Sequence, residues 1–387
     1  MIVRYEPFGA WVKLEKSAAI VALDRDGVRA LGLDGGGVWT EGRSASSPLE
    51  VHAAVTSRCA VGCEGCYLDA RPDGTSPPFD VVVATFDALA KAGVFTVAFG
   101  GGEPTLRDDL GLLAEAARAR GLTPVVTTSG IGLGPRKIAQ LRAFAQVNVS
   151  YDGEGATYAA VRGFDASDEA ERAIAALAEA GVKVGVNVVL TRATFDHLDA
   201  TLSRARSLGA IEAQLLRYKP AGRAKSPDYL MRRLRDDQAR ALGPTLRRLA
   251  EKLGEDFHVR VDCALVPFLA ADESVDAERL ARWGVFGCEA GNALAATKVD
   301  GHLAPCSFAA ASELHVEDIE RGWAGDATLA AFRDYPAAPP EPCASCTLRA
   351  VCRGGCKIVT LDATGAMGPD PECPRVRDHR GGGVPAP

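Results

Sequence analysis

The sequence predicts an α/β protein made of a partial (β/α)6 TIM-like barrel, a small β-rich amino-terminal appendage and a cysteine-rich carboxyl-terminal domain. From residue 49 onward, apolar β-rich runs alternate with segments of helical period, which is typical of parallel βαβ units. The eleven cysteines form two groups, because three lie within residues 59–66 and the other eight lie at residue 263 or beyond. The first 48 residues contain only short β-rich runs.

Length and composition agree with a globular protein. The 387 residues suffice for two or three domains, and hydrophobic and charged residues make up 47% and 24% of them. The net charge of -6 comes without a long basic run, so we expect no nucleic-acid binding. Charged residues interrupt the stretch from Met1 to Leu23, which argues against a signal peptide or a membrane span. We expect a cytoplasmic protein, whose reducing surroundings favour cysteines as metal ligands over disulfides.

Residues 1–48 are predicted to form the appendage. Its β-rich runs, Ala10–Leu14 and Ala18–Leu23, are followed by breaks at Asp24–Gly27 and Asp34–Gly37. Two roles stay open for this segment, a cover on the barrel and a docking site for the substrate. It is too short for a complete winged-helix peptide-recognition module.

Residues 49–257 are predicted to form the barrel. Six strand-like runs lie at 49–56, 94–100, 123–128, 146–151, 183–190 and 210–218. Helical periods lie between or after them at 79–92, 108–120, 166–180, 195–208 and 226–255. Parallel units of this kind join through right-handed crossovers and place their chemistry at the carboxyl ends of the strands.

A loop of three cysteines directly follows the first strand. Cys59, Cys63 and Cys66 have the spacing CxxxCxxC, so their thiolates can converge on one soft metal centre. A cubane iron–sulfur cluster held by three thiolates leaves one iron open for a ligand. A structural zinc site is the alternative, but it needs four ligands. His52 lies in the strand and the next cysteine is Cys263, so a fourth ligand is missing nearby.

The cysteine loop, with the aromatic Tyr67 after its third cysteine, resembles the signature of the radical S-adenosylmethionine (SAM) enzymes. The resemblance implies that Cys59, Cys63 and Cys66 hold a [4Fe-4S] cluster whose open iron binds SAM. It also implies that an electron from this cluster cleaves SAM to methionine and a 5′-deoxyadenosyl radical. Tyr67 is then expected to lie at the cofactor.

Motifs at the next strand ends extend the resemblance. Gly101, Gly102 and Glu103 match the GGEP motif that receives the SAM amino group in that family. Ser129 stands where the family has the Asn of Thr-Asn-Gly, and Ser150, Asp152 and Arg162 resemble its Ser-x-Asp-Gly and Arg-Gly motifs, with Arg162 expected to pair with the SAM carboxylate. The end of the fifth strand, Val189-Leu190-Thr191, is expected to pack against the adenine, with Leu190 as the contact residue. Turn capping is the alternative for Ser129, Ser150 and Asp152.

Charged residues follow the sixth strand. Arg217, Lys219 and Arg223 are interpreted either as partners of a substrate carboxylate or as solvated loop charges. Three groups are candidates for a general base, namely Asp152, Asp262 and Tyr218.

Residues 258–378 are predicted to form a cysteine-rich domain, followed by a disordered tail at 379–387. Seven cysteines and a glycine in register resemble the SPASM domain that follows the barrel in a subset of radical SAM enzymes. The resemblance implies two auxiliary [4Fe-4S] clusters, an outer one on Cys343, Cys346, Cys352 and Cys373 and an inner one on Cys288, Cys306 and Cys356. Cys263 either completes the inner cluster or is a buried spectator that leaves the inner iron open for substrate.

The resemblance therefore implies an enzyme with three [4Fe-4S] clusters and SAM. SPASM members mostly modify peptides, so the leading hypothesis is a maturase that crosslinks a ribosomally made precursor peptide. Its expected partners are that peptide, a separate peptide-recognition protein and an electron donor such as flavodoxin or ferredoxin. The alternatives are a small-molecule dehydrogenase, a formylglycine-type protein maturase, an electron carrier with several clusters and a zinc-loaded scaffold.

Overall fold

The computed structural model describes residues 1–14, 19–33, 39, 44–225 and 227–381. Its main sheet has nine strands in the order β10-β9-β8-β7-β6-β5-β4-β11-β12, and neighbouring strands from β10 to β11 run parallel. Six of these strands match the predicted barrel: β4 (Glu50–Thr56), β5 (Thr96–Gly101), β6 (Thr123–Thr128), β7 (Gln146–Ser150), β8 (Val184–Leu190) and β9 (Glu212–Arg217). The predicted α/β barrel is confirmed.

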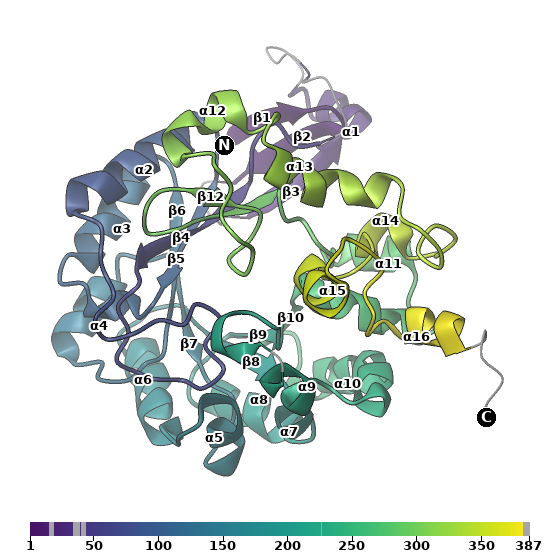
Figure 1. The fold of residues 1–387 in the computed structure, drawn as a ribbon. Helices are drawn as coiled ribbons and strands as arrows, with labels where there is room; N and C mark the ends of the chain where they lie inside the picture. The colour runs from purple at the N-terminus through teal and green to yellow at the C-terminus, as the bar shows by residue number, and fades with distance from the viewer. Residues whose placement is uncertain (15–18, 34–38, 40–43, 226, 382–387) are drawn as a thin grey trace.

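Helices surround the curved sheet on its outer side, as Figure 1 shows. They are α2 (Phe79–Lys91), α3 (Leu110–Ala119), α4 (Pro135–Leu141), α5 (Ala156–Arg162), α6 (Ser167–Glu179), α7 (Arg192–Phe195), α8 (Leu198–Ser207) and α10 (Asp236–Leu253). The short helix α9 (Asp228–Arg232) lies beside the cysteine loop instead, where Arg232 pairs with Glu64. Short 3₁₀ turns, η1 (Pro104–Leu106) and η2 (Gly222–Ala224), follow β5 and β9. The crossovers are therefore helical, as the alternating sequence pattern predicts.

Successive residues of each strand in the main sheet point alternately to the helix-facing core and to the inner face of the barrel. Those of one set, such as Val51, Val147 and Val186, are fully buried in the core that the strands share with the helices. Those of the other set are half-buried, and many are polar. His52 of this second set contacts Glu50 (2.9 Å) and Ser307 Oγ (2.7 Å). The polar inner face escaped the sequence analysis, although the polar residues recur at period two in β4, β7 and β9.

The amino-terminal appendage is a separate antiparallel sheet of β1 (Ile2–Glu6), β2 (Gly9–Lys13) and β3 (Ile20–Asp24). The Arg4 guanidinium donates to the carbonyls of Pro48 and Gly93, and Lys13 Nζ donates to that of Phe95. These carbonyls precede β4 and β5, so the appendage covers the barrel at the amino ends of its strands. This placement favours the cover among the two predicted roles.

Helix α1 (Arg25–Ala30) corrects one expectation, because the sequence analysis interpreted Asp24–Gly27 as a break. The Asp24 side chain accepts a hydrogen bond from Gly27 N and caps this helix. The predicted turn at Asp34–Gly37 lies outside the described residues.

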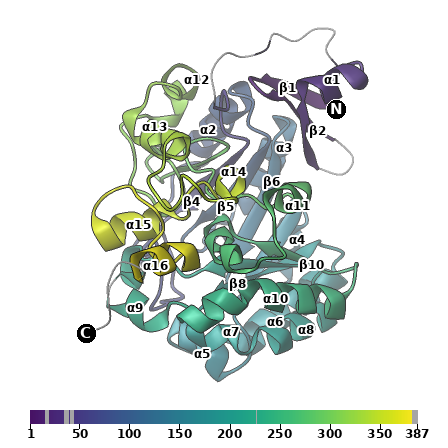
Figure 2. The same cartoon turned by 90° about the vertical axis from the view of Figure 1, so that its right-hand side faces the viewer.

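The last third of the chain lies along the open side of the barrel (Figures 1 and 2). Strand β10 (His258–Val261) pairs with β9, and β11 (Leu294–Thr297) pairs with β4 and with β12 (Leu303–Ala304). The other elements are η3 (Cys263–Ala271), α11 (Ala277–Arg282), η4 (Val316–Asp318), α12 (Ile319–Gly322), α13 (Ala327–Asp334), η5 (Tyr335–Ala337), α14 (Arg349–Cys352), α15 (Lys357–Thr364) and α16 (Pro374–Gly381). Residues on both sides of the predicted boundary at 257 share one sheet and one core, so the domain limits stay a prediction.

The tail predicted to be disordered from residue 379 begins as the last turn of α16, which ends at Gly381. Ion pairs hold this helix to α10, because Arg377 contacts Asp236 and Asp378 contacts Arg240. This segment has no apolar face, and such long-range ion pairs leave no local pattern in the sequence. Residues 382–387 lie outside the described part of the chain.

Candidate functional site

The three-cysteine loop lies at the carboxyl end of β4. The Arg223 guanidinium donates to the Cys63 carbonyl from Nε (2.9 Å) and Nη2 (2.8 Å), and the backbone N–H of Arg223 donates to the Cys66 carbonyl (2.9 Å). Burial raises the pKa of the Cys59 thiol, and the neighbouring Glu103, Cys63 and Cys66 raise it further. The three predicted ligands therefore lie on one loop, which is supported by Arg223 of the turn η2 that follows β9.

Two glycines pack against the backbone around this loop. A Cβ on Gly102 would lie 2.0 Å from the Arg58 carbonyl oxygen, and a Cβ on Gly222 would lie 2.4 Å from that of Cys66. Gly101 is equally close to Thr56, whereas Gly100 has no heavy atom within 4 Å of its Cβ position. The predicted cofactor glycines Gly101 and Gly102 thus pack against the chain itself.

Substitution of Gly222 by alanine is expected to detach the loop. Gly222 has a φ of +57°, so the new methyl group would meet both backbone strain and the Cys66 carbonyl. We expect 5′-deoxyadenosine formation to fall about tenfold or more, which corresponds to about 1.4 kcal/mol. Gly121→Ala is the matched control, because its φ of +78° imposes the same strain with no atom within 4 Å. Equal losses in the two variants would contradict this role of the contact.

The Glu103 carboxylate joins the ends of β5 and β6. Its Oε1 accepts hydrogen bonds from Thr105 Oγ1 and Thr128 Oγ1, both at 2.7 Å, and from Thr105 N at 3.1 Å. Its Oε2 accepts from Ser129 N at 2.8 Å. Ser129 Oγ in turn accepts from Ile131 N at 3.3 Å, which is the predicted turn-capping alternative. Glu103 thus holds the strand ends in addition to any cofactor it binds.

Asp152 and Arg162 form a buried ion pair at the end of β7. Arg162 Nε lies 2.6 Å from Asp152 Oδ2, and Asp152 Oδ1 accepts from Val189 N at 2.7 Å. Arg162 also reaches the cysteine loop, because its Nη1 lies 3.9 Å from Cys63 Sγ and its carbonyl accepts from Glu64 N. Both oxygens of the Asp152 carboxylate are therefore already occupied, one by Arg162 and the other by Val189 N. A carboxylate held in this way is a poor candidate for the predicted general base.

The other two candidate bases, Tyr218 and Asp262, are also held by charged partners. Tyr218 donates its O–H to Asp228, and burial together with this carboxylate raises the pKa of the phenol. Burial favours a higher pKa for Asp262, but the Lys219 ammonium holds it below its usual value.

The side chains of Tyr67, Ser150 and Leu190, all predicted to contact the cofactor, point into different parts of the structure. The Tyr67 ring contacts that of Phe308, with centroids 4.5 Å apart, and burial raises the pKa of Tyr67 to about 12. Ser150 is half-buried on the inner face, as the prediction requires. Leu190 is 1% exposed in the helix-facing core, so it does not have the direction that the predicted adenine contact requires. Its neighbour Val189 has that direction, because side chains alternate along a strand.

The cations after β9 correct both predicted interpretations. Arg217 pairs with Asp370 and Glu372, and all three side chains are at most 3% exposed. Lys219 pairs with Asp262, while Arg223 pairs with Asp69 of the cysteine loop region. Arg217 and Lys219 are buried in their pairs, whereas Arg223 keeps 28% of its side chain exposed, and each of the three cations already has a carboxylate partner on another segment.

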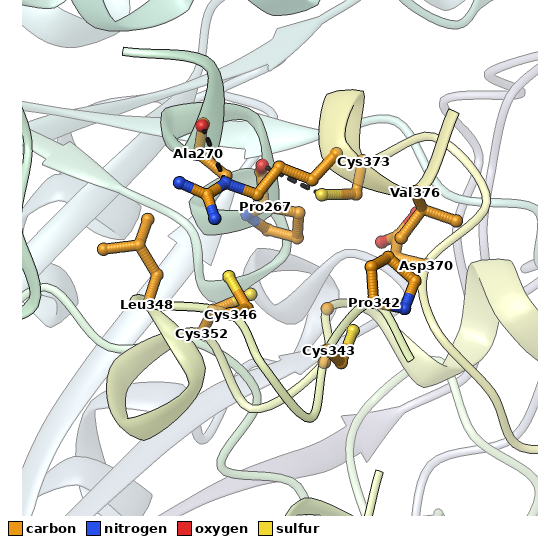
Figure 3. A pocket seen from close by; sticks show the side chains of 13 residues that line it. Pro267, Ala270, Pro342, Cys343, Cys346, Leu348, Cys352, Asp370, Cys373 and Val376 are labelled. Carbon is orange, nitrogen blue, oxygen red and sulfur yellow. Dashed lines mark hydrogen bonds between the residues drawn. The ribbon is translucent and has the colours of Figure 1, made fainter. Parts of the chain in front are cut away.

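Four carboxyl-terminal cysteines line one cavity, which Figure 3 shows from close by. They are Cys343, Cys346, Cys352 and Cys373, the set predicted for the outer cluster. The space between the lining atoms, including its open mouth, is about 330 Å³. Pro267 and Asp370 complete the wall. Four soft donors around one hollow are the donor set that an iron–sulfur cluster requires.

A second group of cysteines lies toward the barrel. Cys356 belongs to a small apolar cluster with Tyr218, and Cys288 and Cys306 pack against it. Burial and the neighbouring Cys288 and Cys356 thiols raise the pKa of the Cys306 thiol to about 12. Burial, Asp262 and Cys288 likewise raise the pKa of Cys263. Among the described residues, no three His, Cys, Asp or Glu side chains are arranged to hold a single metal ion.

Comparison with known proteins agrees with this site. Residues 54–205 match the model of the radical SAM superfamily. The chain is 28% identical to the PqqA peptide cyclase of Ruegeria pomeroyi (86% of this chain, 89% of the relative) and to the mycofactocin maturase MftC of Mycolicibacterium smegmatis (86% and 84%). It is 29% identical to the pre-heme d1 synthase of Dinoroseobacter shibae (82% and 84%).

A solved structure has the same fold. SuiB of Streptococcus suis, bound to S-adenosylmethionine, matches with a TM-score of 0.75 over 96% of this chain and 98% of SuiB, at 17% identity. SuiB bound to the precursor peptide SuiA matches with a TM-score of 0.74. No helix within the described ranges is long and apolar enough to cross a membrane. Residues 54–205 therefore form a radical SAM domain, and the cysteine pattern of the last third resembles that of a SPASM domain.

Proposed function

We propose that this enzyme matures a ribosomally made precursor peptide, most simply by forming a crosslink within it. Two relatives that align along more than four-fifths of the chain are named as a PqqA peptide cyclase and a mycofactocin maturase, and SuiB, which has a similar fold, has been solved with a bound precursor peptide. The observation that carries the proposal is the pairing of a three-cysteine loop at β4 with a four-cysteine cavity in the last third of the chain.

Cys59, Cys63 and Cys66 are the proposed ligands of the cluster that binds SAM. The fit rests on three soft thiols on one supported loop, beside Glu103 and Arg162. When bound, the cluster and SAM supply a 5′-deoxyadenosyl radical that takes a hydrogen atom from the peptide. Glu103 and Arg162 have the charges that suit the SAM amino and carboxylate groups. Gly101, Gly102, Ser129, Ser150 and Tyr67 complete the proposed cofactor site, with Val189 in place of Leu190.

Two auxiliary clusters complete the proposed set of three. The cavity of Cys343, Cys346, Cys352 and Cys373 supports the outer one. Cys288, Cys306 and Cys356 are proposed for the inner one, and the proximity of Cys263 to Cys288 and Cys356 supports Cys263 as its fourth ligand. The enclosing barrel and the cysteine-rich region keep water away from reactive intermediates.

The proposed partners are the precursor peptide, an electron donor such as flavodoxin or ferredoxin, and a separate peptide-recognition protein. A separate peptide-recognition protein is proposed because the chain's own appendage is small and contacts the barrel at the edge opposite the cysteine loop. We place the reaction in the cytoplasm, where a reducing environment protects the clusters.

The test is anaerobic reconstitution, iron and sulfide counting, and incubation with SAM and dithionite. We expect about twelve irons per chain and formation of 5′-deoxyadenosine. Incubation with the peptide encoded beside the gene should then give a product whose mass is lower by two hydrogens per crosslink. Zinc in place of iron, or a fully loaded protein that forms no 5′-deoxyadenosine, would contradict the proposal.

A small-molecule substrate is the second candidate, and the alignment with pre-heme d1 synthase favours it. The two candidates differ in where deuterium is transferred. If 5′-deoxyadenosine acquires deuterium from a labelled precursor peptide, the peptide is the substrate. If it acquires none from the peptide while a cell extract's small-molecule fraction accelerates its formation, the second candidate holds.

A further inference from the structure

A buried ion network connects the barrel to the cysteine-rich region. Arg217 at the end of β9 donates to Asp370 from Nη1 (2.6 Å) and Nη2 (3.1 Å), and to Glu372 from Nη2 (2.8 Å). The side chains of Arg217, Asp370 and Glu372 are 2%, 1% and 3% exposed. The guanidinium also lies over the Phe268 ring, 4.6 Å from its centroid. Charges so deeply buried act on their surroundings with little screening by water.

Asp370 touches both groups of carboxyl-terminal cysteines. It lines the cavity of Cys343, Cys346, Cys352 and Cys373 (Figure 3). Its Oδ2 also accepts a hydrogen bond from the backbone N–H of Cys356, 3.0 Å away, which belongs to the inner group. One carboxylate therefore stands between the two proposed cluster sites.

Two buried cations lie on the inner side of Asp370, and a third, Lys357, donates to the carbonyls of Arg353 and Gly355 beside the outer cavity. Arg217 Nη1 donates to the carbonyl of Ala264, next to Cys263, and its backbone N–H donates to Asp262. Lys219 pairs with the same Asp262. Arg217 and Lys219 thus lie on the inner side of Asp370, beside Asp262 and Cys263, whereas Asp370 itself borders both groups of cysteines.

We propose that Arg217 and Asp370 are positioning residues that set the reduction potentials of the two auxiliary clusters. Asp370 lowers both potentials, and Arg217 raises that of the inner cluster, which makes the inner cluster the easier one to reduce. The physical reason is that one-electron reduction adds a negative charge without breaking a bond, so a nearby buried cation favours it and a buried carboxylate opposes it. This inference rests on the proposed three-cluster function.

The test compares Arg217→Met, Asp370→Asn and the double variant by redox titration followed by electron paramagnetic resonance. The full-length chain is used with Cys59, Cys63 and Cys66 replaced by alanine, so that only the auxiliary clusters give a signal. We expect Arg217→Met to lower the inner potential and Asp370→Asn to raise both potentials. Each shift should be at least tenfold in the equilibrium constant for reduction, about 59 mV for one electron. The double variant should return the inner potential close to its original value.

Two controls separate electrostatics from loss of structure. Arg204→Met breaks the Arg204–Glu171 pair between α6 and α8 and should leave both potentials unchanged. Arg217→Lys keeps the charge and should keep the potentials within about threefold of the original equilibrium constants, about 30 mV or less. If Arg217→Met does not retain iron, the reduction potentials of Arg217→Lys and Asp370→Asn are compared instead. The inference then requires unchanged potentials in Arg217→Lys and raised potentials in Asp370→Asn.

Shifts of the same sign in Arg217→Met and Asp370→Asn, or no shift in a fully loaded Asp370→Asn variant, would overturn the inference. Such a result would leave the proposed function intact, because the auxiliary iron would still be present. A parent chain that binds no iron at the auxiliary sites would instead contradict the proposed function itself.

Discussion

Replacement of Cys59, Cys63 and Cys66 together by alanine is expected to abolish 5′-deoxyadenosine formation. The three thiols are the proposed ligands of the SAM-binding cluster, and no other cysteine among the described residues lies on this loop. The variant should lose about four irons per chain and keep about eight. Iron analysis and chromatography of the SAM products measure both effects.

Cys343→Ala with Cys346→Ala is the matched control, because it removes soft ligands from the outer cavity and leaves the β4 loop unchanged. This variant should lose iron to a similar extent but retain SAM cleavage. If it loses SAM cleavage as completely as the loop variant, the division of the cysteines into separate sites is wrong.

The substitution Arg162→Met is expected to destabilise the fold by about 3–5 kcal/mol, because it leaves the fully buried Asp152 carboxylate without its cation. It should also weaken SAM binding, since Arg162 lies between Asp152 and the cysteine loop. Urea denaturation gives the free energy of unfolding, and SAM titration of the reconstituted enzyme gives the affinity.

The double variant Arg162→Met with Asp152→Asn separates the two effects. Removal of the unpaired charge should recover most of the stability, because a neutral amide costs far less to bury than a carboxylate. The loss of SAM affinity should persist, since the cation is still missing. Recovery of both properties in the double variant would contradict a role of Arg162 at the cofactor.

The barrel could be predicted well from the sequence because its signals are local. The run predicted at 123–128 coincides with β6, and the helical period at 79–92 coincides with α2 to within one residue. The resemblance of the cysteine pattern to the SPASM domain likewise implied which four thiols line the outer cavity. These features depend on periodicity and short motifs, which a single sequence contains.

Long-range pairing was outside the reach of the sequence. Arg217 and Asp370 are 153 residues apart, and nothing in either local pattern indicates the other. Asp152 and Arg162 are only 10 residues apart, but the sequence left the Asp152 carboxylate as a base or a turn cap until the structure placed Arg162 beside it. Strand Val184–Leu190 is apolar except for Asn187, and this one polar residue on the same face as Val189 is the signal that places Leu190 on the opposite face.

The arrangement of strands around β4 affects the order in which the chain can fold during synthesis. Strand β4 carries the cysteine loop and lies between β5, which follows it closely, and β11, which is made only when residues 294–297 leave the ribosome. Until then the strand has one unpaired edge, which is prone to pair with other chains. We therefore expect the nascent enzyme to depend on chaperones until most of the chain has been translated, and to receive its iron late rather than when the loop first emerges.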